Sequence, residues 1–354
     1  MEEKKDTLGM LDLVIRPGFC VKENQIIKVN QAAESLFITP GTDVRPLLLT
    51  GSEEYAAFTG GCLYLTLNLS SHSCGASVTR VDDIDVFLLE QESDNGELRS
   101  MALAARELRE PLTNVMITAD SLFPLCAAES SPRTAEQVAR LNRGLFQILR
   151  IIGNMSDAER CAAVSHQETV DIPALFAEFF EKAETLVSHT GITLTYEGPD
   201  QPIYGLADRE QLERAVLNIL SNAIKFTPKG GTVTAKLTRS GRMLRLSVTD
   251  SGSGIAQSVR SSVFSRYLRQ PALEDSRYGI GLGMVLIRTA AAHHGGAVLI
   301  DQPEGVGTRI TMTMSIRQSK QATLRSNVLR VDYAGEQDHG LIELSECLPT
   351  ELYE

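Results

Sequence analysis

Residues 208–228 read DREQLERAVLNILSNAIKFTP. Apolar residues recur in this stretch at every third or fourth position, which predicts a helix with one face toward a core; they are Leu212, Ala215, Val216, Ile219, Leu220 and Ala223. Asn218 and Asn222 lie one turn apart on a shared face, and Lys225 lies one turn farther on. An amide oxygen there can complete the coordination of a Mg²⁺ that nucleotide phosphates already hold. Taken alone, two asparagines on a helix are more often a solvated face or a helix-packing detail than a ligand site.

A second motif combines a strand with glycines. LRLSVTD (244–250) predicts an apolar strand that ends at Asp250, and SGSGI follows. A carboxylate at this position can accept a hydrogen bond from an exocyclic amino group. Gly252 and Gly254 permit the close approach of a ring. A strand followed by a tight turn is the purely structural alternative.

A third motif, YGIGLGMVLIRTAAAHHGG (278–296), places Gly279, Gly281 and Gly283 before an apolar helix. Backbone N–H groups at such a helix start can bind phosphate. Neither GKS nor GKT follows the glycines, and a Rossmann fingerprint would place its glycines early in a unit that begins with a strand. The two common nucleotide-binding folds are therefore disfavoured.

In order and spacing, these motifs resemble the N box, G1 box and G2 box of the GHKL ATP-binding superfamily, as found in the catalytic domain of sensor histidine kinases. VFSRYLR (263–269) lies where the F box of that family lies, and GVGTRITMTM (305–314) is similar to its closing strand. The resemblance implies ATP and Mg²⁺ as cofactors, with Asn222 as the Mg²⁺ ligand, Asp250 at adenine and residues 270–278 as a lid. The implied nucleotide-binding residues are Asn218, Asn222, Lys225, Asp250, Gly252, Gly254, Gly279, Gly281, Leu282 and Gly283, with Arg266, Arg269 or Arg277 as further phosphate contacts.

Asn218 distinguishes this chain from the ATPases of the superfamily. The gyrase, MutL-type and chaperone members carry a glutamate there, one turn before the Mg²⁺ asparagine, and that glutamate activates water. An amide cannot accept a proton near neutral pH, so phosphoryl transfer to a protein group is favoured over hydrolysis. The expected enzyme class is a protein histidine kinase-type phosphotransferase.

A helical hairpin is predicted over residues 98–165. Two apolar seams with the alternating three- and four-residue spacing of paired helices flank the turn AAESSPRT, in which Pro132 lies near a helix start. The seams are Met101, Ala105, Leu108, Leu112, Val115, Ala119 and Leu122, then Val138, Leu141, Leu145, Ile148, Ile152 and Met155. Since such a hairpin has little core of its own, pairing with a second copy into a four-helix bundle, and hence a homodimer, is expected.

The first helix of the hairpin contains AARELREPLTNV (104–115), which resembles the histidine kinase H box, with core H-E-L-R-T-P-L. Arg106 stands at the position of the phosphate-accepting histidine, and Glu107 retains the neighbouring acid. A guanidinium stays protonated and offers no nucleophilic nitrogen, so self-phosphorylation at this position is not expected. Glu110 replaces the Thr or Asn that assists phosphatase action in the family. His72, His166, His293 and His294 do not replace the missing acceptor cleanly.

The remaining segments are less specific. Residues 8–92 are expected to form an α+β module with strands over 25–30, 62–70 and 85–91; NQIIKVNQAAESLF (24–37) resembles the opening of PAS sensory domains. The module could hold a ligand, transmit strain or dock a protein. SDNGELRS (93–100) is expected to be a linker. Residues 317–354 are an acidic tail of unassigned role, with strand-like fragments at 328–333 and 340–346.

The expected fold is therefore α+β and multidomain: a PAS-like module, a hairpin, and a GHKL α/β sandwich with a mixed sheet over 168–316. The net charge of −11 opposes binding to nucleic acid. No apolar run reaches the roughly 20 residues of a membrane span, and the amino terminus lacks secretory features, so a cytoplasmic location is expected. Three functions stay open: an ATP-binding kinase-like signalling protein that acts on a response regulator or a partner kinase, a two-component kinase with another acceptor, and a non-catalytic ATP-binding dimerisation module.

Overall fold

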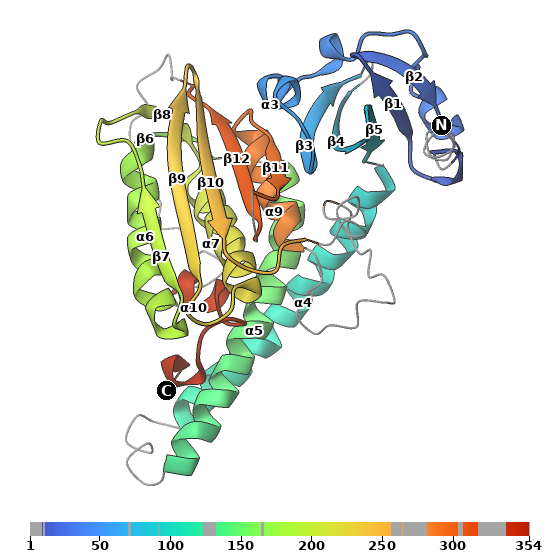
Figure 1. Cartoon of the computed structure of the whole chain (residues 1–354). Coiled ribbons are helices and arrows are strands. Elements are labelled where there is room, and N and C mark those ends of the chain that lie inside the picture. The colour runs from blue at the N-terminus through green and yellow to red at the C-terminus, as the bar shows by residue number, and fades with distance from the viewer. Residues whose placement is uncertain are drawn as a thin grey trace.

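The fold is described from a computed structural model (Figure 1). The description covers residue 9 and residues 11–69, 72–90, 92–122, 132–163, 166–255, 264, 282–303, 307–317 and 338–353. Along the chain these residues form an N-terminal module (11–90), a helical hairpin (92–163), a C-terminal domain (166–317) and a C-terminal segment (338–353). Among the described helices, none combines the length and the apolar character that crossing a lipid bilayer requires.

The N-terminal module is a five-stranded antiparallel sheet with short helices. Its strands are β1 (Gly18–Lys22), β2 (Gln25–Val29), β3 (Cys62–Asn68), β4 (Ser73–Val81) and β5 (Ile84–Leu89), in the order β2-β1-β5-β4-β3. The helices are η1 (Leu11–Leu13), α2 (Gln31–Glu34), η2 (Arg45–Leu47) and α3 (Ser52–Ala56). The core is centred on Phe19, whose ring stacks on that of Phe87 at 4.7 Å between centroids. The three predicted strands correspond to β2, β3 and β5, whereas β1 and β4 were not predicted.

Asn30 connects β2 to α2 through its side chain. Its Oδ1 accepts hydrogen bonds from the backbone N–H groups of Ala33 and Gly18, each at 3.0 Å. The first bond caps the helix and the second fixes the start of β1. The strand predicted over 25–30 is therefore followed directly by a short helix.

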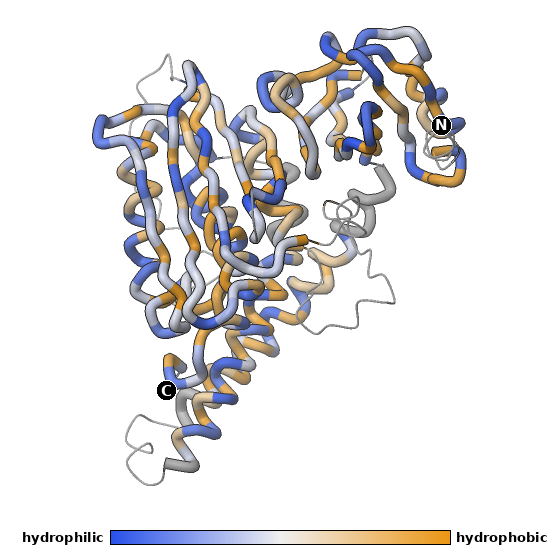
Figure 2. The backbone as a smooth tube through the Cα atoms, viewed as in Figure 1, coloured by the Kyte–Doolittle hydropathy of each residue, from blue (hydrophilic) through white to orange (hydrophobic). Residues whose placement is uncertain are grey.

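The hairpin consists of α4 (Glu92–Leu122) and α5 (Pro132–Ala163). Hydrophobic residues recur along both helices (Figure 2). Alternate residues of each predicted seam meet inside the hairpin, where Ala105, Leu112 and Ala119 share a buried cluster with Leu145 and Ile152. Four seam residues between them face outward: Leu108 and Val115 are each 51% exposed, Ile148 is 47% exposed and Leu141 is 41% exposed.

The prediction of a linker at residues 93–100 was wrong, because these residues lie in the first turns of α4. Polarity suggested a linker, but Glu, Leu and Arg are good helix formers and Gly96 is the only strong helix breaker in the stretch. The helix can therefore extend over them. Pro132 begins α5, as predicted.

The C-terminal domain is a layered α/β structure. Its main sheet contains β7 (Thr193–Glu197), β9 (Thr232–Ser240), β10 (Met243–Asp250), β11 (Val298–Asp301) and β12 (Arg309–Ser315), and β6 (Glu168–Asp171) pairs separately with β8 (Tyr204–Ala207). The helices are α6 (Ile172–Val187), η4 (Ser188–Thr190), α7 (Arg209–Phe226) and α9 (Leu282–His293). Because β7 is parallel to β9 and the other pairs are antiparallel, the sheet is mixed, as predicted. The helices α6, α7 and α9 cover one face of it (Figure 1).

The sheets of the N-terminal module and the C-terminal domain are continuous. Residues Cys62–Tyr64 of β3 pair antiparallel with Val298–Ile300 of β11, giving one ten-stranded sheet. Arg288 of α9 strengthens this junction, since its Nη2 lies 2.5 Å from Glu90 Oε1 and its guanidinium lies 5.0 Å from the centre of the Tyr64 ring. The sequence contained no local signal for this pairing.

The C-terminal segment consists of α10 (His339–Glu343) and η5 (Thr350–Tyr353), which pack against the hairpin and the C-terminal domain. The prediction of a strand at 340–346 was wrong. Asp338 caps a helix there, because its side chain accepts a hydrogen bond from the N–H of Leu341 at 3.1 Å. Leu344, Leu348 and Tyr353 are buried in the main hydrophobic core of the C-terminal domain. The other predicted fragment, at 328–333, lies outside the described residues.

Candidate nucleotide site

Helix α7 supplies the polar residues expected at the site. Asp208 caps its first turn by accepting from the N–H of Gln211 at 3.2 Å, and the predicted apolar stripe is buried. Asn222 is half-buried, and its side chain makes no hydrogen bond to another described residue. Asn218 is 1% exposed and donates from Nδ2 to the carbonyl oxygen of Arg214 at 2.9 Å. The two amides therefore differ in availability, and Asn222 is the one open to a ligand.

The other amide atom of Asn218 faces the start of α9. Asn218 Oδ1 is buried and has no hydrogen-bond partner within the described part of the chain. A Cβ atom at Gly283 would lie 2.5 Å from this oxygen, so glycine is required for α9 to approach α7 this closely. Gly283 thus has a packing role, and Leu282 beside it is buried with Val285 against Met155 of the hairpin.

Asp250 ends β10 in a buried turn. Its Oδ1 accepts hydrogen bonds from the N–H groups of Gly252, at 2.8 Å, and Thr308, at 3.2 Å. Burial raises the pKa of the Asp250 carboxyl, while these two bonds and a hydrogen bond from the Thr308 side chain act in the opposite direction. Both backbone bonds use the same carboxylate oxygen, Oδ1.

The glycines of this turn are required by its geometry. A Cβ atom on Gly252 would lie 2.3 Å from the carbonyl oxygen of Phe226, at the end of α7. Gly254 has a φ of +73°, in the left-handed region that favours glycine. The tight turn of the structural alternative therefore exists, and it holds the Asp250 carboxylate next to the end of α7.

A magnesium ion fits the donor chemistry of α7. Mg²⁺ prefers oxygen ligands and usually retains substrate phosphates and water in its coordination shell. The half-buried Asn222 amide can supply one oxygen, and the unpartnered Asn218 Oδ1 lies one turn away. When bound, the ion would neutralise phosphate charge, while Asn222 would orient it.

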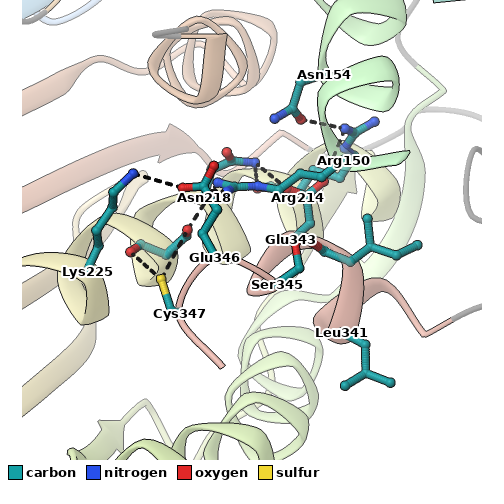
Figure 3. A network of polar contacts seen from close by, with 12 residues as sticks. Arg150, Asn154, Arg214, Asn218, Lys225, Leu341, Glu343, Ser345, Glu346 and Cys347 are labelled. Atoms are coloured by element: carbon teal, nitrogen blue, oxygen red, sulfur yellow. Dashed lines mark hydrogen bonds and ion pairs between the residues drawn. The ribbon is translucent and has the colours of Figure 1, made fainter. Parts of the chain in front are cut away.

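Lys225 does not face open solvent. Its Nζ lies 2.8 Å from Oε2 of Glu346 in the C-terminal segment, and Asn218 Nδ2 lies 3.3 Å from Oε2 of Glu343 (Figure 3). Glu343 also pairs with Arg214 of α7, at 3.2 Å, and with Arg150 of α5, at 3.3 Å. The candidate phosphate contact of α7 is thus already bound to acidic groups from the end of the chain.

The electrostatics of this network favour its charged form. Burial alone would raise the pKa of Glu346, but Arg150 and Lys225 outweigh it and hold the pKa below its usual value. Burial likewise opposes the charge of Arg150, and Glu343 and Glu346 raise its pKa above the usual range. The sequence showed an acidic tail, but it could not indicate these partners, because more than a hundred residues separate them.

The hairpin presents Arg106 to solvent. Arg106, Glu107 and Glu110 are all exposed on α4. Among the histidines, His294 is buried; its Nε2 accepts from the N–H of Asp208 at 3.0 Å, so its Nδ1 donates to the carbonyl oxygen of Ala290 at 2.7 Å. His294 therefore has a structural role between α7 and α9.

Several predicted positions cannot be placed. Gly279 and Gly281, the candidate phosphate contacts Arg266, Arg269 and Arg277, and the predicted lid at 270–278 all lie outside the described residues. Phe264 is the one described residue of the segment expected as the F box, and its buried carbonyl oxygen accepts from Nη1 of Arg288 at 3.0 Å. Thr308 and Arg288 were not predicted as site residues.

Comparison with known proteins agrees with this geometry. Residues 207–318 match the family described as histidine kinase-, DNA gyrase B- and HSP90-like ATPase. An uncharacterized sensor-like histidine kinase of Rhizobium meliloti is 28% identical over 276 residues, which are 73% of this chain and 52% of that protein. Residues 207–318 are thus similar to this ATPase family, and most of the chain is similar to proteins named as sensor histidine kinases.

Two further proteins are similar to this chain. The adaptive-response sensory kinase SasA of Crocosphaera subtropica is 26% identical over 246 residues, covering 66% of this chain and 64% of that protein. The crystal structure of full-length ShkA in complex with AMPPNP matches with a TM-score of 0.51 and 23% identity, over 62% of this chain and 46% of that one. The latter similarity shows the fold alone. The chain spans about half to two thirds of the length of these sequence relatives.

Proposed function

We propose that this chain is a histidine-kinase-like signal transduction protein that binds Mg-ATP between α7, the turn after β10 and the start of α9. The proposal rests mainly on the position of Asp250. Its carboxylate is buried, and two backbone N–H groups donate to one of its oxygens. It lies beside the end of α7, the helix that bears Asn222 and Lys225. The matched ATPase family and the nucleotide analogue in the ShkA complex support this assignment. A cytoplasmic location and a PAS-like role for the N-terminal module belong to the same proposal.

The exposed seam residues of the hairpin support dimerisation through α4 and α5. Leu108, Val115, Leu141 and Ile148 are between 41% and 51% exposed, although their spacing is that of a helix-pairing seam. Leaving such a row in water forgoes the burial that stabilises helix bundles. A second copy of the hairpin would cover this row and complete a four-helix bundle.

The destination of the phosphoryl group is proposed to be another protein. Arg106 is exposed where an acceptor would lie, but it offers no nucleophile. Action in trans on a response regulator or a partner kinase remains compatible with the site.

A second candidate function is a dimer whose conformation ATP sets without catalysis. It is favoured by Asn218, whose buried amide stands one turn before Asn222 and cannot serve as a base for water. Transfer of label from γ-labelled ATP to a response regulator would contradict this second candidate.

The phosphate acceptor can be tested by restoring the histidine. Arg106→His is expected to acquire acid-labile label from γ-labelled ATP, because Glu107 and the H-box residues Leu108, Arg109, Pro111 and Leu112 are retained. The unchanged chain and the matched Arg106→Gln variant are expected to remain unlabelled. Acid-labile label on the unchanged chain would show that another residue accepts the phosphate.

A further inference from the structure

The C-terminal segment places two glutamates, three residues apart in the chain, against polar side chains of α7. Glu343 is fully buried and contacts Arg150, Arg214 and the amide of Asn218. Glu346 lies 2.8 Å from Lys225 Nζ and 3.1 Å from Arg150 Nη1 (Figure 3). Three cations from two helices thus converge on two carboxylates.

The segment is docked by more than these charges. Ile342, Leu344 and Leu348 are almost fully buried. Arg143 of α5 donates to the backbone oxygens of Ser345, at 3.0 Å, and Glu346, at 3.1 Å. Backbone recognition fixes the register of the segment, so that Glu346 rather than another acid of the tail meets Lys225.

The same contacts conflict with a bound triphosphate. The Lys225 side chain is 14% exposed and its ammonium group is engaged by Glu346, so little of it is left for phosphate oxygens. Glu346, whose pKa Arg150 and Lys225 lower, would also repel a polyanion brought to this face of α7, since like charges at close range in a partly buried site are unfavourable. Docking of the segment and binding of the nucleotide phosphates therefore exclude each other at Lys225.

We infer that residues 338–353 are an intramolecular inhibitor of the nucleotide site. When the segment is docked, Glu343 and Glu346 occupy the face of α7 at which the phosphate oxygens would bind. Mg-ATP binds after the segment has left this face. Because the segment also contacts α5, its release removes a tie between the hairpin and the C-terminal domain. This inference rests on the proposed Mg-ATP site.

The first test compares variants of the full chain for their affinity for Mg-ATP. Glu346→Gln keeps the size of the side chain and removes its charge, so it is expected to bind Mg-ATP roughly five-fold more tightly, the factor that corresponds to about 1 kcal/mol of lost ion pairing. Glu351→Gln is the matched control, since Glu351 is an exposed acid of the same segment. In a Lys225→Met background, Glu346→Gln is expected to have a smaller effect, because only the pairing of Glu346 with Arg150 and its repulsion of phosphate remain to be removed.

The outcomes of this test separate the two proposals. Equal affinity of the unchanged chain and Glu346→Gln, or weaker binding by Glu346→Gln, overturns the inhibitory role and leaves the nucleotide site intact. Absence of Mg-ATP binding in all variants overturns the proposed function and the inference with it.

Hydrogen exchange on the unchanged chain gives a second readout. With saturating Mg-AMPPNP, the amides of α7 and of the turn after Asp250 are expected to exchange more slowly, and those of residues 341–348 faster. Slower exchange in α7 with unchanged or slower exchange at 341–348 means that nucleotide and segment bind together, which contradicts inhibition. No change at either place contradicts nucleotide binding itself.

Discussion

Asp250 combines a structural role with the proposed binding role in one carboxylate, since the backbone bonds use Oδ1 alone. Asp250→Asn should keep those two bonds, as an amide oxygen also accepts, while losing the charged acceptor for an exocyclic amino group. We expect Mg-ATP affinity to fall by about 10- to 100-fold with little loss of stability. Isothermal titration would measure the affinity, with exposed Asp200→Asn as the control. An unchanged affinity would remove Asp250 from the site.

The lowered pKa of buried His294 leads us to expect that the stability of the protein depends on pH. Burial lowers its pKa from 6.5, so the unfolded chain binds a proton at this residue more readily than the folded chain does. The free energy of unfolding should therefore decrease as the pH falls below 6.5, by up to about 1.4 kcal/mol per pH unit, until the pH reaches the folded pKa. Urea unfolding of His294→Gln should show a weaker dependence between pH 6.5 and 5. Exposed His189→Gln should retain the dependence of the unchanged chain.

At the scale of elements, the proposed dimer depends on the exposed row of the hairpin formed by Leu108, Val115, Leu141 and Ile148. Replacing Leu108 and Val115 together by glutamate would place charge on the row that a second copy is proposed to cover. The dissociation constant of the dimer should rise roughly 100-fold or more, measured by sedimentation equilibrium. The control is Leu49→Glu, which also replaces an exposed leucine but lies in the N-terminal module. A strictly monomeric unchanged chain at micromolar concentration would contradict the proposed bundle.

Elements with a local period were the ones that the sequence could predict. The spacing of Leu212, Val216 and Ile219 indicated α7, and the strand that ends at Asp250 indicated the turn of the site. The polar residues at 93–100 suggested a linker, but helix propensity prevails there. The stretch at 340–346 looked like a strand, but Asp338 caps a helix there. The short strand β1 was missed because only its pairing with β2 and β5 identifies it.

For the whole molecule, Arg288 connects the C-terminal domain to the N-terminal module through Glu90. Its side chain is 4% exposed, so Arg288→Met would leave Glu90 without this partner in a partly buried site. The free energy of unfolding should fall by about 3 kcal/mol. Arg309→Met, which breaks a more exposed pair with Asp301, should cost under about 1 kcal/mol. Losses of equal size in the two variants would mean that the junction contributes little.

Long-range partners account for what the sequence could not predict at this scale. Glu343 and Glu346 meet Arg150 and Lys225 across more than a hundred residues, and β3 meets β11 across more than two hundred. No spacing rule connects such segments, since their contacts depend on how complete domains pack. The turn after Asp250 was therefore predictable. The two glutamates that contact the neighbouring helix α7 were not.

The pairing of β3 with β11 also decides what can be cut from this chain. A fragment limited to residues 168–316 would leave the backbone N–H and C=O groups at Val298–Ile300 without the strand that satisfies them. An open strand edge of this kind is a template for pairing between molecules and for aggregation. The N-terminal module thus acts as a protective cover for the sheet edge, and a well-behaved ATP-binding fragment would need either that module or a charged residue introduced on β11.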